Sequence, residues 1–173
     1  MRTGRELIIA SWGIAGVIAL VSRALISLTP IALETIRAGQ LRTWHWVVLV
    51  GWVVTNAYAE GLVGFHRKFS PRTVDRALYL GRNPTWGRVL LAPAFCMGLF
   101  HAPRKVRIVS RSMVVGIILL VVTVRHLAQP WRGIIDAGVV VGLALGLASL
   151  IYLFVRAVVT KREPVLHQVE SQS

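Results

Sequence analysis

Long runs without positive charge alternate along this chain with short stretches that are crowded with Lys and Arg. The runs 46–62, 113–124 and 133–155 are apolar on every helical face and hold almost no charge. At 1.5 Å of rise per residue, runs of roughly 15–20 residues approach the ~30 Å hydrocarbon core of a bilayer. The pattern therefore predicts an all-α integral membrane protein.

Four transmembrane helices are predicted, at about 7–28, 44–65, 113–128 and 133–155, in a single domain over 1–160 with a polar tail at 161–173. The first apolar run follows Arg2 and Arg5 and lacks a convincing cleavage site, so we interpret it as a retained signal anchor that ends near Pro30. Trp44 and Trp46 begin the second segment as aromatic interface anchors.

Small residues recur every four positions on two of these segments. Such stripes let another helix approach closely, and we expect them to pack against partner helices. They are Ser11, Ala15 and Ala19 in the first segment and Gly138, Gly142 and Gly146 in the last.

Two further helices are predicted at the membrane surface. Over 71–80, Ser70 is suited to the N-cap, Pro71 to the first turn and Gly81 to the end, with apolar residues on one side and Arg72 and Arg76 on the other. The stretch 84–102 is apolar for only about a dozen residues and contains Pro93, which indicates a kinked interfacial or re-entrant helix rather than a span.

Charge counting supports four spans. With 84–102 at the surface, fifteen Lys and Arg fall on one side of the membrane and four on the other. With five spans the two sides carry ten and nine. The positive-inside rule favours the first arrangement, with both termini cytoplasmic, in a membrane such as the bacterial inner membrane.

The net charge of +13 does not indicate nucleic-acid binding, because the charge is segregated from long apolar runs rather than spread over amphipathic elements. We expect the basic residues to form a cationic face that contacts anionic lipid headgroups or an acidic partner. That face comprises Arg67, Lys68, Arg72, Arg76, Arg104, Lys105, Arg107 and Arg111.

Polar residues inside the predicted spans are candidate functional residues, because a carboxylate there is costly unless it is paired, neutralised or hydrated. Glu60 shares a helix face with Asn56 and Trp52, and it either has a functional role or reaches headgroup water, Arg67 or Arg107 near the inner end of its helix. Asp136 is expected to tie helices together by pairing with a nearby arginine. The other candidates are His66 and His101 at the inner side and Arg125 and His126 at the outer side.

Metal and cofactor chemistry find little support in the sequence. Cys96, Met97 and His101 resemble a Cu(I) ligand set only weakly, and Cys96 is expected to be a small buried hydrophobe. No phosphate loop, HExxH or GxSxG motif is present, so no cofactor is expected.

Three functions remain open at this point. The first is an accessory or complex-forming membrane subunit with a cationic cytoplasmic face, packed against other helices or a second copy. The second is a small oligomeric transporter or channel in which Glu60 titrates. The third is a membrane enzyme acting on a lipid or quinone, which requires Glu60 to meet His66 or His101.

Overall fold

The computed structural model describes residues 4–39, 41–99, 104–161 and 164, except for the side chains at 104–106, 109, 110, 113, 114 and 120. Within that range the chain consists of helices joined by short loops and contains no strand, which confirms the all-α class. The elements are α1 (Gly4–Arg37), α2 (Thr43–Asn56), the π-helix η1 (Ala57–Phe69), α3 (Ser70–Arg82), α4 (Trp86–Leu90), α5 (Ala92–Cys96), α6 (Arg104–Arg125) and α7 (Trp131–Val159).

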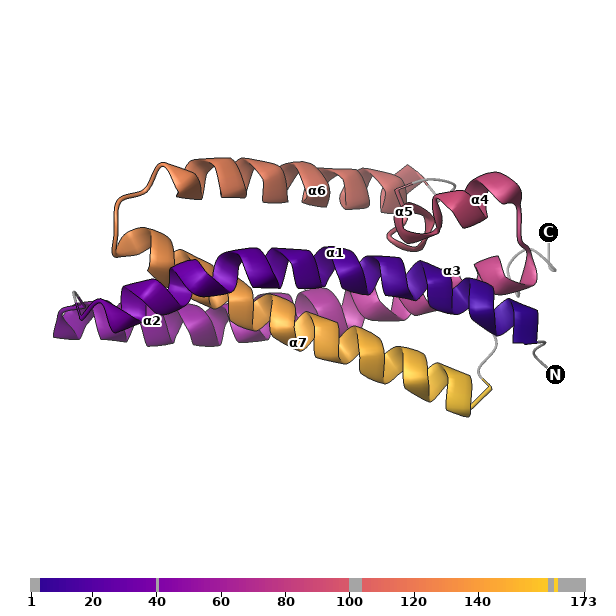
Figure 1. Cartoon of the computed structure of the whole chain (residues 1–173), viewed down its shortest axis with the longest axis horizontal. Coiled ribbons are helices and arrows are strands. Elements are labelled where there is room, and N and C mark those ends of the chain that lie inside the picture. The colour runs from indigo at the N-terminus through magenta and orange to yellow at the C-terminus, as the bar shows by residue number, and fades with distance from the viewer. Residues whose placement is uncertain (1–3, 40, 100–103, 162–163, 165–173) are drawn as a thin grey trace.

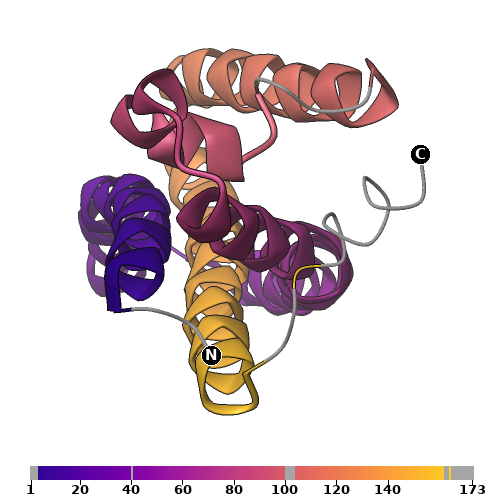
Figure 2. The same ribbon diagram turned by 90° about the vertical axis from the view of Figure 1, so that its right-hand side faces the viewer.

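Three helical segments in the described residues are long and apolar enough to cross a membrane. They are α1, the unbroken run α2–η1–α3 over Thr43–Arg82, and α7. Figure 1 shows α1 running in the opposite direction to the other two, which are parallel to each other. Seen end-on in Figure 2, α7 lies between α1 and the α2–η1–α3 run.

The contacts of four glycines fix these directions. Gly138 faces Trp52 and Gly146 faces Phe65, so residue numbers rise together along α7 and α2–η1. Gly133 faces Thr35 at one end of α1, and Gly81 faces the main chain of Glu6 at the other. We call these two ends of the bundle the Trp44 end and the Arg82 end.

α1 does not end near Pro30 but continues to Arg37. Proline removes one helical hydrogen bond and bends a helix, but tertiary packing can hold the turns that follow. Ala32 and Thr35 are buried, and the Thr35 hydroxyl lies 2.7 Å from Oε1 of Gln129 in the loop before α7. This packing explains why the expected end at Pro30 was wrong.

The predicted surface helix 71–80 is part of α3, which continues η1 without a break. Ser70 is completely buried and makes no cap hydrogen bond. The apolar face of α3 packs on α1, α5 and α7 rather than on lipid, in a core that includes Ile14, Ala77 and Leu80. α3 is amphipathic, but other helices of the chain cover its apolar face.

The stretch 84–102 forms two short helices that meet at Leu91. Pro93 lies in the first turn of α5, where its missing N–H is tolerated. Its ring sits on Gly16 of α1. The single kinked interfacial helix is therefore not confirmed, and its end at 100–102 lies outside the described residues.

The predicted span 113–128 lies largely in α6, which begins earlier and ends at Arg125. Its apolar part among the described residues, Val115–Arg125, is too short to count as a span by length and composition. α6 makes few contacts with α7, and both views show it standing apart from the three long helices (Figures 1 and 2). A fourth span is not established on these grounds.

Candidate functional site

The candidate site is a row of polar side chains where α2 and η1 pack on α7, which we call the polar seam. It comprises Trp52, Asn56, Glu60 and His66 on α2–η1 and Ser149 on α7. Trp52, Asn56 and Glu60 recur every four residues, opposite the glycines of α7. The glycine stripe thus serves a close contact within the chain.

Glycine is required along this contact because the opposing side chains occupy the space of a Cβ. A Cβ at Gly142 would lie 3.1 Å from the Cβ of Glu60, and one at Gly138 would meet the indole of Trp52 and, at 3.0 Å, Nδ2 of Asn56. The other expected stripe behaves differently. Ala15 and Ala19 of α1 are exposed, whereas Gly13 and Gly16 of the same helix receive α5.

Two hydrogen bonds satisfy the polar groups at the start of the seam. The Trp52 indole Nε1 donates to the main-chain oxygen of Ile135 at 3.2 Å, and Asn56 Nδ2 donates to the main-chain oxygen of Trp52 at 2.9 Å. Asn56 is only 7% exposed. Internal partners of this kind are expected where the bilayer offers no water.

Glu60 lies in the first turn of the π-helix that starts at Ala57. π-Helical hydrogen bonds reach five residues back, and such segments are frequent at functional sites. The change in geometry also alters the spacing of the seam. Trp52 to Glu60 proceeds in steps of four, but the next side chain that meets a glycine of α7, Phe65 on Gly146, is five residues after Glu60.

The carboxylate of Glu60 points away from the contact. Its Cβ lies against α7, but the side chain is exposed, and Oε2 would lie 3.5 Å from a Cβ at Gly64 on the same helix. Within the described residues no hydrogen bond or ion pair reaches it. In particular, neither Arg67 nor Arg107, the expected alternatives, forms such a pair there.

His66 closes the seam through a hydrogen bond of 2.7 Å between its Nδ1 and the hydroxyl of Ser149. Sequence reasoning missed Ser149, although it lies three residues after Gly146 on the glycine stripe of α7. His101 lies outside the described residues. Among the described residues no hydrogen bond joins Glu60 to His66, so the expected grouping of Glu60 with His66 or His101 stays a prediction.

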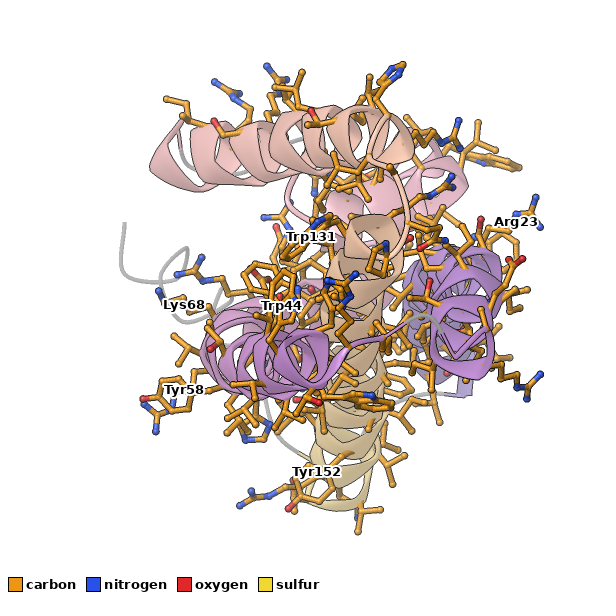
Figure 3. The ribbon with its side chains drawn as sticks, turned by 90° about the vertical axis from the view of Figure 1, so that its left-hand side faces the viewer. Arg23, Trp44, Tyr58, Lys68, Trp131 and Tyr152 are labelled. Carbon is orange, nitrogen blue, oxygen red and sulfur yellow. The ribbon has the colours of Figure 1, made fainter. Side chains whose placement is uncertain are left out.

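Asp136 is buried on α7, with Nε of Arg132 at 3.9 Å from its Oδ2. The pair joins two turns of one helix rather than two helices, because the residues are four apart. Arg125 and His126 are exposed at the end of α6. Arg23 projects away from the bundle on α1, as Figure 3 shows.

The basic face is divided by burial. Arg67, Lys68, Arg72 and Arg111 are exposed, and Arg107 is half-buried. The helix backbone at Arg104 and Lys105 is described, but their side chains lie outside the described residues. Figure 3 shows Lys68 and Tyr58 on the outer side of η1, on the opposite side of the bundle from Arg23.

Arg76 does not belong to that outward face, because it is only 6% exposed. Its Nε donates to the main-chain oxygen of Phe95 at 2.6 Å, and its guanidinium lies 4.2 Å from the centre of the Phe95 ring. Arg88 approaches the same ring at 5.7 Å. Arg76 therefore holds α5 on α3. The sequence does not predict this role, because it does not show where Phe95 lies.

Cys96 is 1% exposed, and its sulfur occupies the space that a Cβ at Gly13 would need. Burial raises the pKa of this thiol from its ordinary value of 9.0 to about 12, so it remains protonated at neutral pH. Met97 packs against the core, His101 lies outside the described residues, and no cluster of three His, Cys, Asp or Glu occurs in the part described.

Comparison with protein-family models, curated proteins and solved structures finds no match to this chain.

Proposed function

We propose that this protein is a complex-forming multi-pass membrane subunit whose Glu60 is covered by a helix of another chain or of a second copy. The observation that carries the proposal is the exposed carboxylate of Glu60, which has no partner among the described residues. Glu60 is sixteen residues beyond Trp44, no more than about 24 Å along the helix. If Trp44 marks the interface, that depth lies inside the ~30 Å hydrocarbon core.

A carboxylate at that depth is stabilised by a hydrogen-bond donor or a cation. The partner helix would therefore present a Lys, Arg or polar side chain to Glu60. Exposed apolar side chains elsewhere on η1, such as Leu62, which is 48% exposed, would supply van der Waals packing with the partner.

The exposed cations Arg67, Lys68 and Arg72 follow Glu60 by two to three turns on η1 and α3. On our proposal they lie at the cytoplasmic boundary, where they bind anionic headgroups or an acidic surface of the partner. Each such cation contributes roughly 1 kcal/mol near an anionic membrane.

We also propose four membrane crossings with both termini cytoplasmic, the fourth being α6. The reason is the parallel direction of α2–η1–α3 and α7. A chain that has crossed in one direction must return before it crosses again in that direction. α6 connects the Arg82 end to the Trp44 end and is the segment available for that return.

A photo-crosslinking residue at Leu62 tests the partner. In native membranes it should give a discrete adduct, and Glu60→Gln should reduce the yield severalfold. The control is the same crosslinker at Ile26 of α1, which is more exposed, at 68%. Equal yields at the two positions, or a monomeric particle without adducts, would rule the complex out.

A second candidate is ion or proton transport by an oligomer, with Glu60 as the titrating group. The π-helical turn that carries Glu60 and the polar seam beside it favour this idea. It predicts a pH-dependent flux in liposomes that Glu60→Gln abolishes. A stable complex that shows no such flux would exclude transport and support the subunit role.

A further inference from the structure

A cavity of about 490 Å³ lies between α2, α6 and α7 near the Trp44 end. Its walls are almost wholly apolar and include Val48 on α2, Leu119 on α6 and Ile135 on α7. The volume lies in the range of sites that hold a small ligand. Two of the polar groups that line it are engaged, since Trp52 Nε1 donates to Ile135 and Thr123 to Leu119.

The position of the cavity selects the ligand. Trp131 lines the cavity, Ile134 and Ile135 are three and four residues after it, and Val48 is four residues after Trp44, so the walls extend from the level of the tryptophans to about 6 Å beyond them. Trp44 and Trp131 pack together with ring centres 5.3 Å apart (Figure 3). Paired tryptophans at the ends of apolar helices are interface anchors, so the cavity lies at the depth of the upper acyl chains.

Two arginines lie at the Trp44 end of α6 and α7, two of the helices that line the cavity. Arg125 follows the lining residue Val124 and is exposed, and Arg132 follows the lining residue Trp131. The Nε of Arg132 is buried and makes no hydrogen bond, being 3.9 Å from Asp136. An apolar cavity with arginines at the Trp44 end of its lining helices suits a phospholipid, with an acyl tail in the cavity and the phosphate at the arginines.

We infer that this cavity is a binding site for one glycerophospholipid of the leaflet at the Trp44 end. One acyl chain fills the space between α6 and the helices α2 and α7, and the phosphate is held by Arg125 and Arg132. The lipid thereby supplies packing for α6, which touches its own chain only sparsely.

The test is native mass spectrometry of the full chain, purified in mild detergent and supplied with phosphatidylglycerol. We expect one retained lipid per chain. Ile135→Trp, which fills the cavity, should remove it, whereas Val50→Trp on the exposed face of α2, at 57% exposure, should not.

A second variant avoids the core. Arg125→Gln changes an exposed side chain and should weaken lipid retention about tenfold, the worth of one charge-assisted hydrogen bond. Arg37→Gln, an exposed arginine at the same end, is the matched control. Retention that is unchanged in both Ile135→Trp and Arg125→Gln would overturn the inference, as would a wild-type chain that retains only detergent.

Discussion

The indole of Trp52 on α2 donates a hydrogen bond of 3.2 Å to the main-chain oxygen of Ile135 on α7, across a contact that Gly138 makes possible. A helical carbonyl already accepts one hydrogen bond within its helix, and its second lone pair is free for this indole. The bond therefore fixes the register of two parallel helices. Asn56 and Glu60 follow at successive steps of four on the side of α2–η1 that meets the glycines of α7.

Replacing Gly138 by Leu should destabilise the bundle by about 1–3 kcal/mol, because the added side chain meets the indole of Trp52. Gly51→Leu is the matched control, since nothing lies within 4 Å of a Cβ at that position. Thermal unfolding in detergent measures both. Equal stability of the two variants would show that α2 and α7 do not pack through Gly138.

Arg76→Ala should lower the free energy of unfolding by about 2–3 kcal/mol, because a charged hydrogen bond to Phe95 and a cation–π contact are lost. Arg72→Ala, four residues earlier and exposed, should change it by less than about 0.5 kcal/mol. The same substitution of Arg76 should loosen α5 and speed maleimide labelling of Cys96. Labelling as slow as in the wild type would contradict this role for Arg76.

The pKa of Cys96 makes stability depend on alkaline pH. Since the folded pKa of about 12 exceeds the ordinary 9.0, the folded state binds the thiol proton more tightly than the unfolded state. The stability that this thiol contributes to the folded state is fully present below pH 9. It is lost as the pH rises toward 12, by up to about 2 kcal/mol at about pH 10.5. The difference in unfolding free energy between wild type and Cys96→Ala, measured at about pH 8 and pH 10.5, isolates this thiol. A difference that does not shrink with pH would refute the predicted shift.

The helical class and the apolar segments could be predicted because they depend on composition and length. The starts of the second and last long helices were predicted within a few residues, since Trp44 and Pro130 mark where α2 and α7 begin, but the second helix continues without a break to Arg82. The close helix contact along the glycine stripe could also be predicted, because glycine every four residues in a membrane helix commonly marks such a contact. Which helix makes the contact could not be predicted, since a helix of a partner and a helix of the same chain require the same residues.

The errors arose where tertiary contacts override local signals. Pro30 marks a helix end only when nothing holds the next turns, and Thr35 does hold them. Arg76 was predicted to lie on a solvated face because its hydrogen-bond acceptor, Phe95, is nineteen residues away, and no sequence pattern indicates that the two residues meet. The π-helix around Glu60 likewise has no sequence signature, so the change of spacing after Glu60 could not be foreseen.

The proposed four crossings place Ala38 and Ala128 on one side of the membrane and Asn83 and Thr160 on the other. All four residues are exposed and lie at helix ends. In a Cys96→Ala background, single cysteines at Ala38 and Ala128 should react with an impermeant maleimide on intact cells, whereas those at Asn83 and Thr160 should react only after permeabilisation. Labelling of Asn83 and Ala128 from the same side would mean that α6 does not cross. Trp52 on Gly138 and Phe65 on Gly146 make α2–η1 parallel to α7, so both helices can cross the membrane only if the chain returns between them. Without a crossing by α6 there is no such return, and α2–η1 and α7 could not both span the membrane.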